Sequence, residues 1–163
     1  QRQMCIRDRD KSVTYIYDIS SKKLTEIAPS TVDLLLPSGA EKLDYVLYTD
    51  ESPYKTQREW LDRLPFDVYS VNVHTGAKQL IGRNYRTAPK WSMNGKWAVM
   101  YDPIAQVWNK FDGATGKVVN ISDAIGYPMF VESYDKPAPA PAYGIAGWTA
   151  DGNNVFLLSL IHI

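Results

Sequence analysis

The stretch WSMNGK, from Trp91 to Lys96, decides the fold, because the chain repeats it 57 residues later as WTADGN, from Trp148 to Asn153. In both copies a tryptophan precedes an Asn-Gly or Asp-Gly turn, and apolar residues follow the turn. Glycine supplies the positive φ that a tight hairpin turn requires at little steric cost. Each copy therefore predicts an antiparallel hairpin. The stretch from Pro37 to Leu47 is a weaker third copy.

A second type of hairpin alternates with the first along the chain. Residues 69–81 and 108–121 each contain two apolar stretches joined by a Thr-Gly turn, and residues 15–27 repeat the pattern without the glycine. Apolar and polar residues alternate in these segments, which is the period of a β-strand, and no long stretch has the period of a helix. Short helical turns are expected only at 57–62 and 122–125. The sequence therefore predicts an all-β chain.

One hairpin of each type, joined together, makes a four-stranded antiparallel unit of the kind that forms a β-propeller blade. The expected units are an outer half at 12–28, a full blade with a long insertion at 31–82, a compact full blade at 87–122 and an inner half at 143–157. About three blades are thus present, whereas a closed propeller has roughly four to eight. The sequence favours a partial β-propeller, and a β-sandwich is the alternative architecture.

The repeats also predict which residues form the core and the turns. Large apolar residues at the repeated strand positions should be buried between blades, namely Trp91, Val99, Trp148 and Phe156. Four glycines should lie in hairpin turns, several of them with positive φ, namely Gly76, Gly95, Gly116 and Gly152.

The two ends of the chain share one explanation at the level of DNA. Leu158 to Ile163 back-translate as CTG TCT CTT ATA CAC ATC, and the complementary strand, with one further base, encodes Met4 to Arg9. This sequence resembles the transposon-end adapter of sequencing libraries. We therefore expect residues 1–9 and 158–163 to be artefacts, and residues 10–157 to be native protein that continues beyond both ends.

The composition of the 163-residue chain argues against several classes of protein. Its 18 basic and 18 acidic residues balance, and no long basic run marks a surface for nucleic acid or an anionic membrane. At 45% hydrophobic residues it is too apolar for disorder, yet it has no continuous apolar stretch long enough for a membrane span. One cysteine and two histidines favour neither a disulfide nor a metal site. We expect a globular domain with no metal, cofactor, nucleic-acid partner or membrane span.

The two hairpin motifs carry a resemblance to a known family. The stretch from Trp91 to Lys96 is close to an S-P-D-G-K consensus, from which Met93 and Asn94 depart. Together with Phe111 to Ser122, it resembles propeller blades of the prolyl oligopeptidase and dipeptidyl peptidase group of serine peptidases. The run from Tyr134 to Thr149 is similar to the prolyl oligopeptidase-like peptidases of Bacteroidetes-type bacteria.

This resemblance, which covers about residues 10–157, implies a parent enzyme with an amino-terminal propeller and a carboxy-terminal α/β-hydrolase domain that carries a Ser-Asp-His triad. The implied role of the propeller is to restrict access to that site and to select short peptides, and related proteins are commonly exported to the periplasm. This chain contains no G-x-S-x-G motif, and His74 stands directly before Thr75 and Gly76 in a turn. We therefore expect no catalytic residue here. The alternative is a propeller that only binds ligands, such as a periplasmic scaffold or a sugar-binding module.

The insertion between residues 50 and 67 contains the candidate binding residues. Tyr54, Arg58 and Trp60 place a cation close to two aromatic rings, a combination that can hold a peptide terminus or carbonyl by charge and stacking. We predict that these three residues face the substrate, and the alternative is an insertion that packs Trp60 against its own blade. A glycosidase pair is disfavoured, because solvated loop groups are the simpler interpretation of the nearby carboxylates Asp50, Glu51, Asp62 and Asp67.

Overall fold

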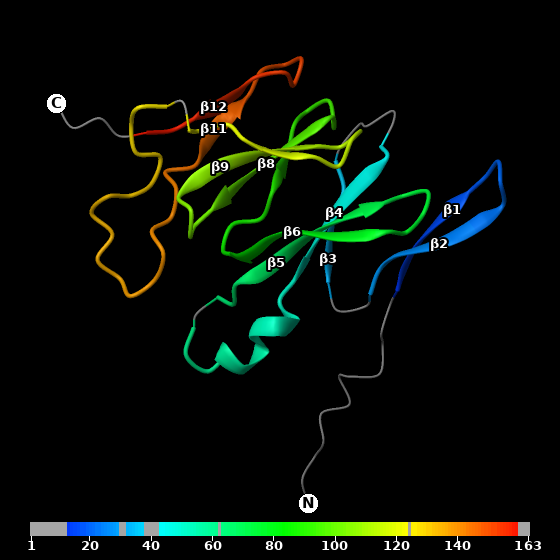
Figure 1. The fold of residues 1–163 in the computed structure, drawn as a ribbon, viewed down its shortest axis with the longest axis horizontal. Coiled ribbons are helices and arrows are strands. Elements are labelled where there is room, and N and C mark those ends of the chain that lie inside the picture. The colour runs from blue at the N-terminus through cyan, green and yellow to red at the C-terminus, as the bar shows by residue number, and fades with distance from the viewer. Residues whose placement is uncertain (1–12, 30–31, 38–42, 62, 124, 160–163) are drawn as a thin grey trace, which may run out of the picture.

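The computed structural model describes residues 13–29, 32–37, 43–61, 63–123 and 125–159. Within these ranges the chain is all-β apart from one short 3-10 helix, and its longer strands form four antiparallel sheets (Figure 1). The expected artefact at 1–9 lies outside the described residues, as does 160–163 of the one at the other end. No helix in the described part of the chain is long and apolar enough to cross a membrane.

Within each sheet, every strand pairs with the next strand in sequence. Sheet 1 contains β1 (Thr14–Asp18) and β2 (Lys23–Ala28). Sheet 2 contains β3 (Asp33–Leu35), β4 (Tyr45–Asp50), β5 (Phe66–Asn72) and β6 (Lys78–Tyr85). Sheet 3 contains β7 (Lys90–Trp91), β8 (Trp97–Asp102), β9 (Val107–Asp112) and β10 (Val118–Asn120), and sheet 4 contains β11 (Ile145–Trp148) and β12 (Val155–Leu157). This grouping into two, four, four and two strands agrees with the hairpins expected from the sequence.

The sheets pack face to face in chain order, with a separate apolar core between each neighbouring pair. In β4, Val46 and Tyr48 pack toward sheet 1, whereas Leu47 packs toward sheet 3. In β8, Met100 belongs to the core shared with sheet 2 and Val99 to the core shared with sheet 4. Successive side chains of a strand point to opposite faces, so the central strands of sheets 2 and 3 bury both faces. This explains why these strands are apolar almost throughout.

The prediction that Phe156 is buried is wrong. Its neighbours Val155 and Leu157 pack against sheet 3, so the alternation of the strand turns Phe156 to the opposite face, where it is 56% exposed. Val99 holds the equivalent position in sheet 3 and is 1% exposed, as predicted, because sheet 4 covers it. Burial at this repeated position therefore depends on whether a further sheet lies against it.

The two repeated tryptophans are half-buried and face the preceding sheet. The Trp91 ring packs edge to face on Phe111, with ring centroids 5.9 Å apart, and its Nε1 donates a 3.0 Å hydrogen bond to the main-chain oxygen of Leu35 in sheet 2. Trp148 packs against the core between sheets 3 and 4, but its buried Nε1 has no hydrogen-bond partner among the described residues. Both residues thus tie a sheet to the one before it.

The predicted positive φ of the loop glycines is confirmed. The values are +73° for Gly76, +68° for Gly95, +70° for Gly116 and +68° for Gly152. In the β1–β2 loop, which lacks a glycine, Lys22 takes the corresponding position with a φ of +55°. The turn geometry is therefore maintained where the sequence signal for it is missing.

The first helical turn begins earlier than expected. The 3-10 helix η2 covers Ser52–Gln57. Pro53 lies in its first turn, because the fixed φ of proline matches the value that a helix start requires. The N–H groups of Trp60 and Leu61 then donate to the Gln57 oxygen, at 3.0 and 3.1 Å. Helical structure thus begins before the expected stretch 57–62, of which Asp62 lies outside the described residues. At the turn expected at 122–125, of which residue 124 lies outside the described part of the chain, the Ile125 N–H donates to the Ser122 oxygen at 3.0 Å.

Candidate functional site

The insertion that carries the predicted binding residues joins β4 to β5. It contains η2 and lies at one end of sheet 2, beyond the strands (Figure 1). A hydrogen-bonded cluster attaches it there. The Tyr54 hydroxyl donates to Asp67 Oδ1 at 2.6 Å. The main-chain N–H of Asn84 donates to the Tyr54 hydroxyl oxygen at 2.9 Å and to Asp67 Oδ1 at 3.2 Å.

Both hydrogen bonds of the Tyr54 hydroxyl in this cluster are made to other residues of the protein. Asp67 is buried, and Asn84 has a φ of +56° next to a bulge in the pairing of β5 with β6. Burial, and then the hydrogen bond to Asp67, raise the pKa of the Tyr54 hydroxyl. The Tyr54 hydroxyl therefore serves to hold η2 on sheet 2.

The other two predicted residues lie at the surface. Trp60 is 82% exposed, so the alternative in which it packs against its own sheet is wrong. Arg58 is also exposed, and its Nη2 lies 3.9 Å from Glu51 Oε2. Of the three predicted residues, only Arg58 lines the hollow at this end of the sheet. Substrate contact by Tyr54 and Trp60 stays a prediction.

This hollow has a volume of about 610 Å³. Its charged lining consists of Glu51, Arg58, Arg63 and Arg86. Its apolar lining consists of Leu61, Leu64, Phe66 and Ala88. We call it the arginine hollow. Leu61 and Leu64 belong to the insertion, Phe66 begins β5, and Ala88 follows β6.

The described lining of the arginine hollow contains more basic than acidic residues. Three arginines and one glutamate belong to it, and Asp62, which lies between Leu61 and Arg63 in sequence, is outside the described residues. The Arg58–Glu51 pair is exposed to solvent, so it contributes little to stability. The Arg86 Nε atom is buried and has no hydrogen-bond partner among the described residues. A buried donor without an acceptor is costly, because the loss of water from that N–H group is not compensated by a hydrogen bond.

Sequence reasoning found Arg58 and missed Arg63 and Arg86. Arg63 follows Trp60 by three residues but has no motif that marks it, and Arg86 lies just past the end of β6. Only the pairing of β5 with β6 brings Arg86 beside the insertion. A pattern search along the chain has no signal for this arrangement.

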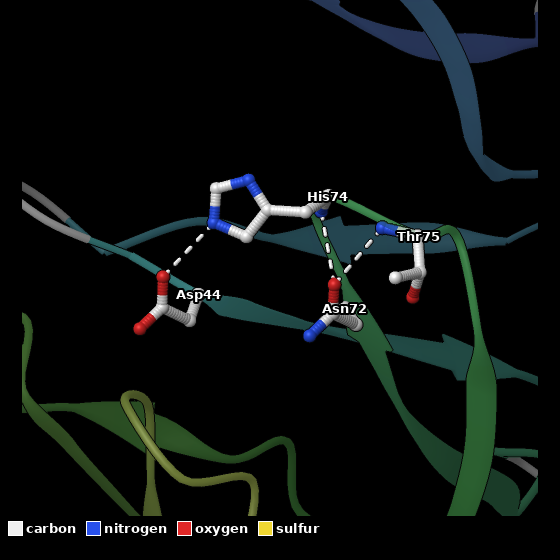
Figure 2. Close-up of polar contacts among 4 residues, drawn as sticks. All are labelled: Asp44, Asn72, His74 and Thr75. Atoms are coloured by element: carbon white, nitrogen blue, oxygen red, sulfur yellow. Dashed lines mark hydrogen bonds and ion pairs between the residues drawn. The ribbon is translucent and has the colours of Figure 1, made fainter.

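His74 lies at a different place, in the loop between β5 and β6. Its Nε2 is 3.0 Å from Asp44 Oδ1, and the main-chain N–H groups of His74 and Thr75 each donate to Asn72 Oδ1 at 3.0 Å (Figure 2). Both members of the His74–Asp44 pair are more than half exposed. Among the described residues, no hydroxyl or thiol hydrogen-bonds to this imidazole. The pair therefore lacks the nucleophile that acyl transfer requires, and it ties the loop to the start of β4.

The carboxylates near the insertion are held by local partners. Asp50 Oδ1 accepts hydrogen bonds from the main-chain N–H of Ser52, at 2.8 Å, and from the Ser52 hydroxyl. Asp67 bonds to Tyr54, Glu51 pairs with Arg58, and Asp62 lies outside the described residues. In the described ranges no three Asp, Glu, His or Cys side chains gather in a way that suits a metal ion.

No protein-family model matches this chain, and no curated protein matches it.

Proposed function

We propose that the chain is part of a β-propeller that serves as the non-catalytic, substrate-selecting part of a prolyl oligopeptidase-like serine peptidase. The propeller part of this proposal is supported by the packing of four antiparallel sheets in chain order, each built from consecutive strands. A β-sandwich encloses one core between two sheets. Sheets 2 and 3 instead bury both of their faces, which is what a blade inside a propeller does.

Hydrogen bonds between sheets support the same arrangement. The Tyr45 N–H donates to the Gly113 oxygen at 3.0 Å, which links β4 of sheet 2 to the β9–β10 loop of sheet 3. Asn94 Nδ2 donates to the Asp151 oxygen at 2.7 Å, which links the hairpin turns of sheets 3 and 4. Neighbouring sheets are therefore held in register at their turns as well as through their cores.

The peptidase part of the proposal rests on the motifs that resemble prolyl oligopeptidase-like blades, from Trp91 to Lys96 and from Tyr134 to Thr149. The triad belongs to a separate α/β-hydrolase domain of the same parent protein. The insertion between β4 and β5 lies at one end of sheet 2, where it can present the arginine hollow to a peptide. Selection of peptides at this end is the role we assign to the chain.

A propeller that only binds ligands is the second candidate. The arginine hollow favours it equally, because a charged hollow can hold an anionic ligand without any hydrolase domain. The two candidates differ in what the parent protein contains beyond this chain.

The test uses the full-length protein encoded by the native gene, together with the 163-residue chain. We expect a fluorophosphonate probe to label the full-length protein at one serine outside residues 10–157 and to leave the chain unlabelled. A full-length protein with no G-x-S-x-G motif and no labelling would refute the peptidase and leave the binding-only propeller. Labelling of any serine within the chain would refute its non-catalytic role.

A further inference from the structure

We propose that the arginine hollow binds a peptide carboxylate, with an apolar side chain of the same peptide beside it. This deepens the proposed function, on which it rests for the peptide nature of the ligand. A carboxylate is present both at the carboxy terminus of a peptide and on an acidic side chain. Peptides that carry only one of these two groups distinguish the two sources.

The charge of the hollow selects an anion. Among the described residues, Arg58, Arg63 and Arg86 line it together with one acidic residue, Glu51. A guanidinium group presents its N–H donors in a planar fork that matches the two oxygens of a carboxylate. The Nε of Arg86 is buried and has no partner among the described residues, so a carboxylate that reached it would give this unsatisfied donor a charge-assisted hydrogen bond.

The apolar lining selects an organic anion over an inorganic one. Leu64 is buried in the wall of the hollow, and Leu61 and Phe66 line it beside the arginines. A phosphate or sulfate ion has nothing to place against these surfaces, whereas a peptide end carries a side chain next to its carboxylate. The volume of about 610 Å³ suits one or two residues of a peptide and not a folded domain.

The site is held in place before the ligand arrives. The hydrogen bonds from Tyr54 to Asp67, and from Asn84 to both, fasten η2 to sheet 2. Glu51 directly precedes η2, and Arg58 directly follows it, with its main-chain N–H donating to the Lys55 oxygen. The backbone that carries these two side chains is therefore held in place before the ligand binds, which reduces the conformational entropy lost on binding.

The experiment measures binding of fluorescent short peptides to the full 163-residue chain by anisotropy. One peptide ends in leucine with a free carboxylate and has no acidic residue, the second is the same peptide amidated, and the third is amidated and carries one glutamate. We expect the first peptide, the third, or both to bind at least about tenfold more tightly than the second, as charge-assisted hydrogen bonds require. Binding of the first alone identifies the carboxy-terminal group, and binding of the third identifies an acidic side chain.

Two variants and a matched control test the residues. We expect Arg63→Gln and Arg86→Gln each to weaken binding about tenfold or more. Arg83→Gln removes an exposed arginine of β6 that does not line the hollow, and it should change binding by less than about twofold. Arg63 is exposed, so its variant tests the site even where Arg86→Gln lowers stability. Thermal unfolding of each variant checks its folding.

Three results would overturn the proposal. These are equal binding of all three peptides, equal loss of binding in the Arg83→Gln control, and displacement of the peptide by inorganic phosphate at an equal concentration. The assay needs no hydrolase domain, so its outcome is independent of the fluorophosphonate test. A chain that binds the carboxylate while its full-length protein lacks a hydrolase would retain this inference and lose the peptidase proposal.

Discussion

The side-chain amide of Asn94 donates a hydrogen bond to the main-chain oxygen of Asp151, and these two residues hold the same position in the two copies of the repeated hairpin. The turns of successive repeats therefore touch one another directly. Asn94 Oδ1 also accepts hydrogen bonds within its own turn, from the Ser92 hydroxyl at 2.7 Å and the Lys96 N–H at 3.0 Å. The consensus aspartate at position 94 would accept these bonds but has no donor for Asp151.

The first prediction tests this contact. Asn94→Asp removes the donor and places a carboxylate against a carbonyl oxygen, so the free energy of unfolding should fall by about 1 to 2 kcal/mol. Urea unfolding of the full chain measures the change. Asn154→Asp is the control, because the side chain of Asn154 is exposed and only its backbone takes part in the turn. Equal stability of Asn94→Asp and the parent chain would show that the contact contributes nothing.

The second prediction concerns Gly116, which has a φ of +70° and lies against the Tyr45 ring of sheet 2. A Cβ at this position would lie 2.9 Å from two ring atoms. Backbone strain and this clash together should make Gly116→Ala destabilising by roughly 1 to 3 kcal/mol in urea unfolding. Gly126→Ala should be nearly neutral, because no atom of the described residues, apart from its own neighbours, lies within 4 Å of the added Cβ. If the two variants proved equally stable, the close packing of sheet 3 on sheet 2 would be in doubt.

The third prediction tests the attachment of the insertion. Tyr54→Phe leaves the buried Asp67 without its hydroxyl donor, which should lower the free energy of unfolding by about 1 to 3 kcal/mol. The same change should weaken peptide binding, because η2 would no longer be held on sheet 2 and Arg58, which follows it, would no longer be held in position. Tyr17→Phe is the control, since Tyr17 is exposed on sheet 1. Unchanged stability and binding in Tyr54→Phe would contradict this anchoring role.

The fourth prediction concerns alkaline pH. Burial is the first cause that raises the pKa of Tyr48, Tyr85 and Tyr101 to about 12, above the ordinary value of 10. The folded state therefore favours the neutral phenols. Their contribution to stability should be complete below pH 10 and should be lost as the pH rises from 10 toward 12.

Ultraviolet absorbance of the phenolate follows this titration, with urea unfolding measured at each pH. In Tyr85→Phe the number of phenols that ionise near pH 12 should fall by one. Ionisation of all tyrosines at their ordinary pKa while the chain is still folded would mean that these side chains are open to solvent.

The fifth prediction concerns self-association. Tyr15 and Tyr17 are about half exposed on the outer face of sheet 1, while Ile16 between them packs toward sheet 2. Aromatic residues on an uncovered sheet face promote association, so the double substitution Tyr15→Thr with Tyr17→Thr should reduce light scattering of the chain without lowering its stability. Ile16→Thr should instead lower the stability of the chain and increase its light scattering. A fully monomeric parent chain would remove the basis for this expectation.

The sequence alone was sufficient to predict the hairpins and their turns. An Asn-Gly or Asp-Gly turn needs only its own residues to adopt positive φ, and alternation along a strand is a local property, so the pairing of the strands from β1 to β12 could be anticipated. The position of η2 was less well predicted, because Pro53 shifts the start of the helix and the hydrogen bonds of Tyr54 hold it there. Arg58 could be singled out because it lies among aromatic residues in one insertion.

Only the tertiary structure decided which faces are covered and which side chains converge. Phe156 and Val99 hold equivalent sequence positions, yet one is exposed and the other buried, because burial depends on a neighbouring sheet that no local pattern encodes. The arginine hollow likewise joins Arg63 of the insertion to Arg86, which lies beyond β6. These residues meet through the pairing of β5 with β6, and contacts between distant segments arise from packing energy summed over the whole chain rather than from any short stretch of it.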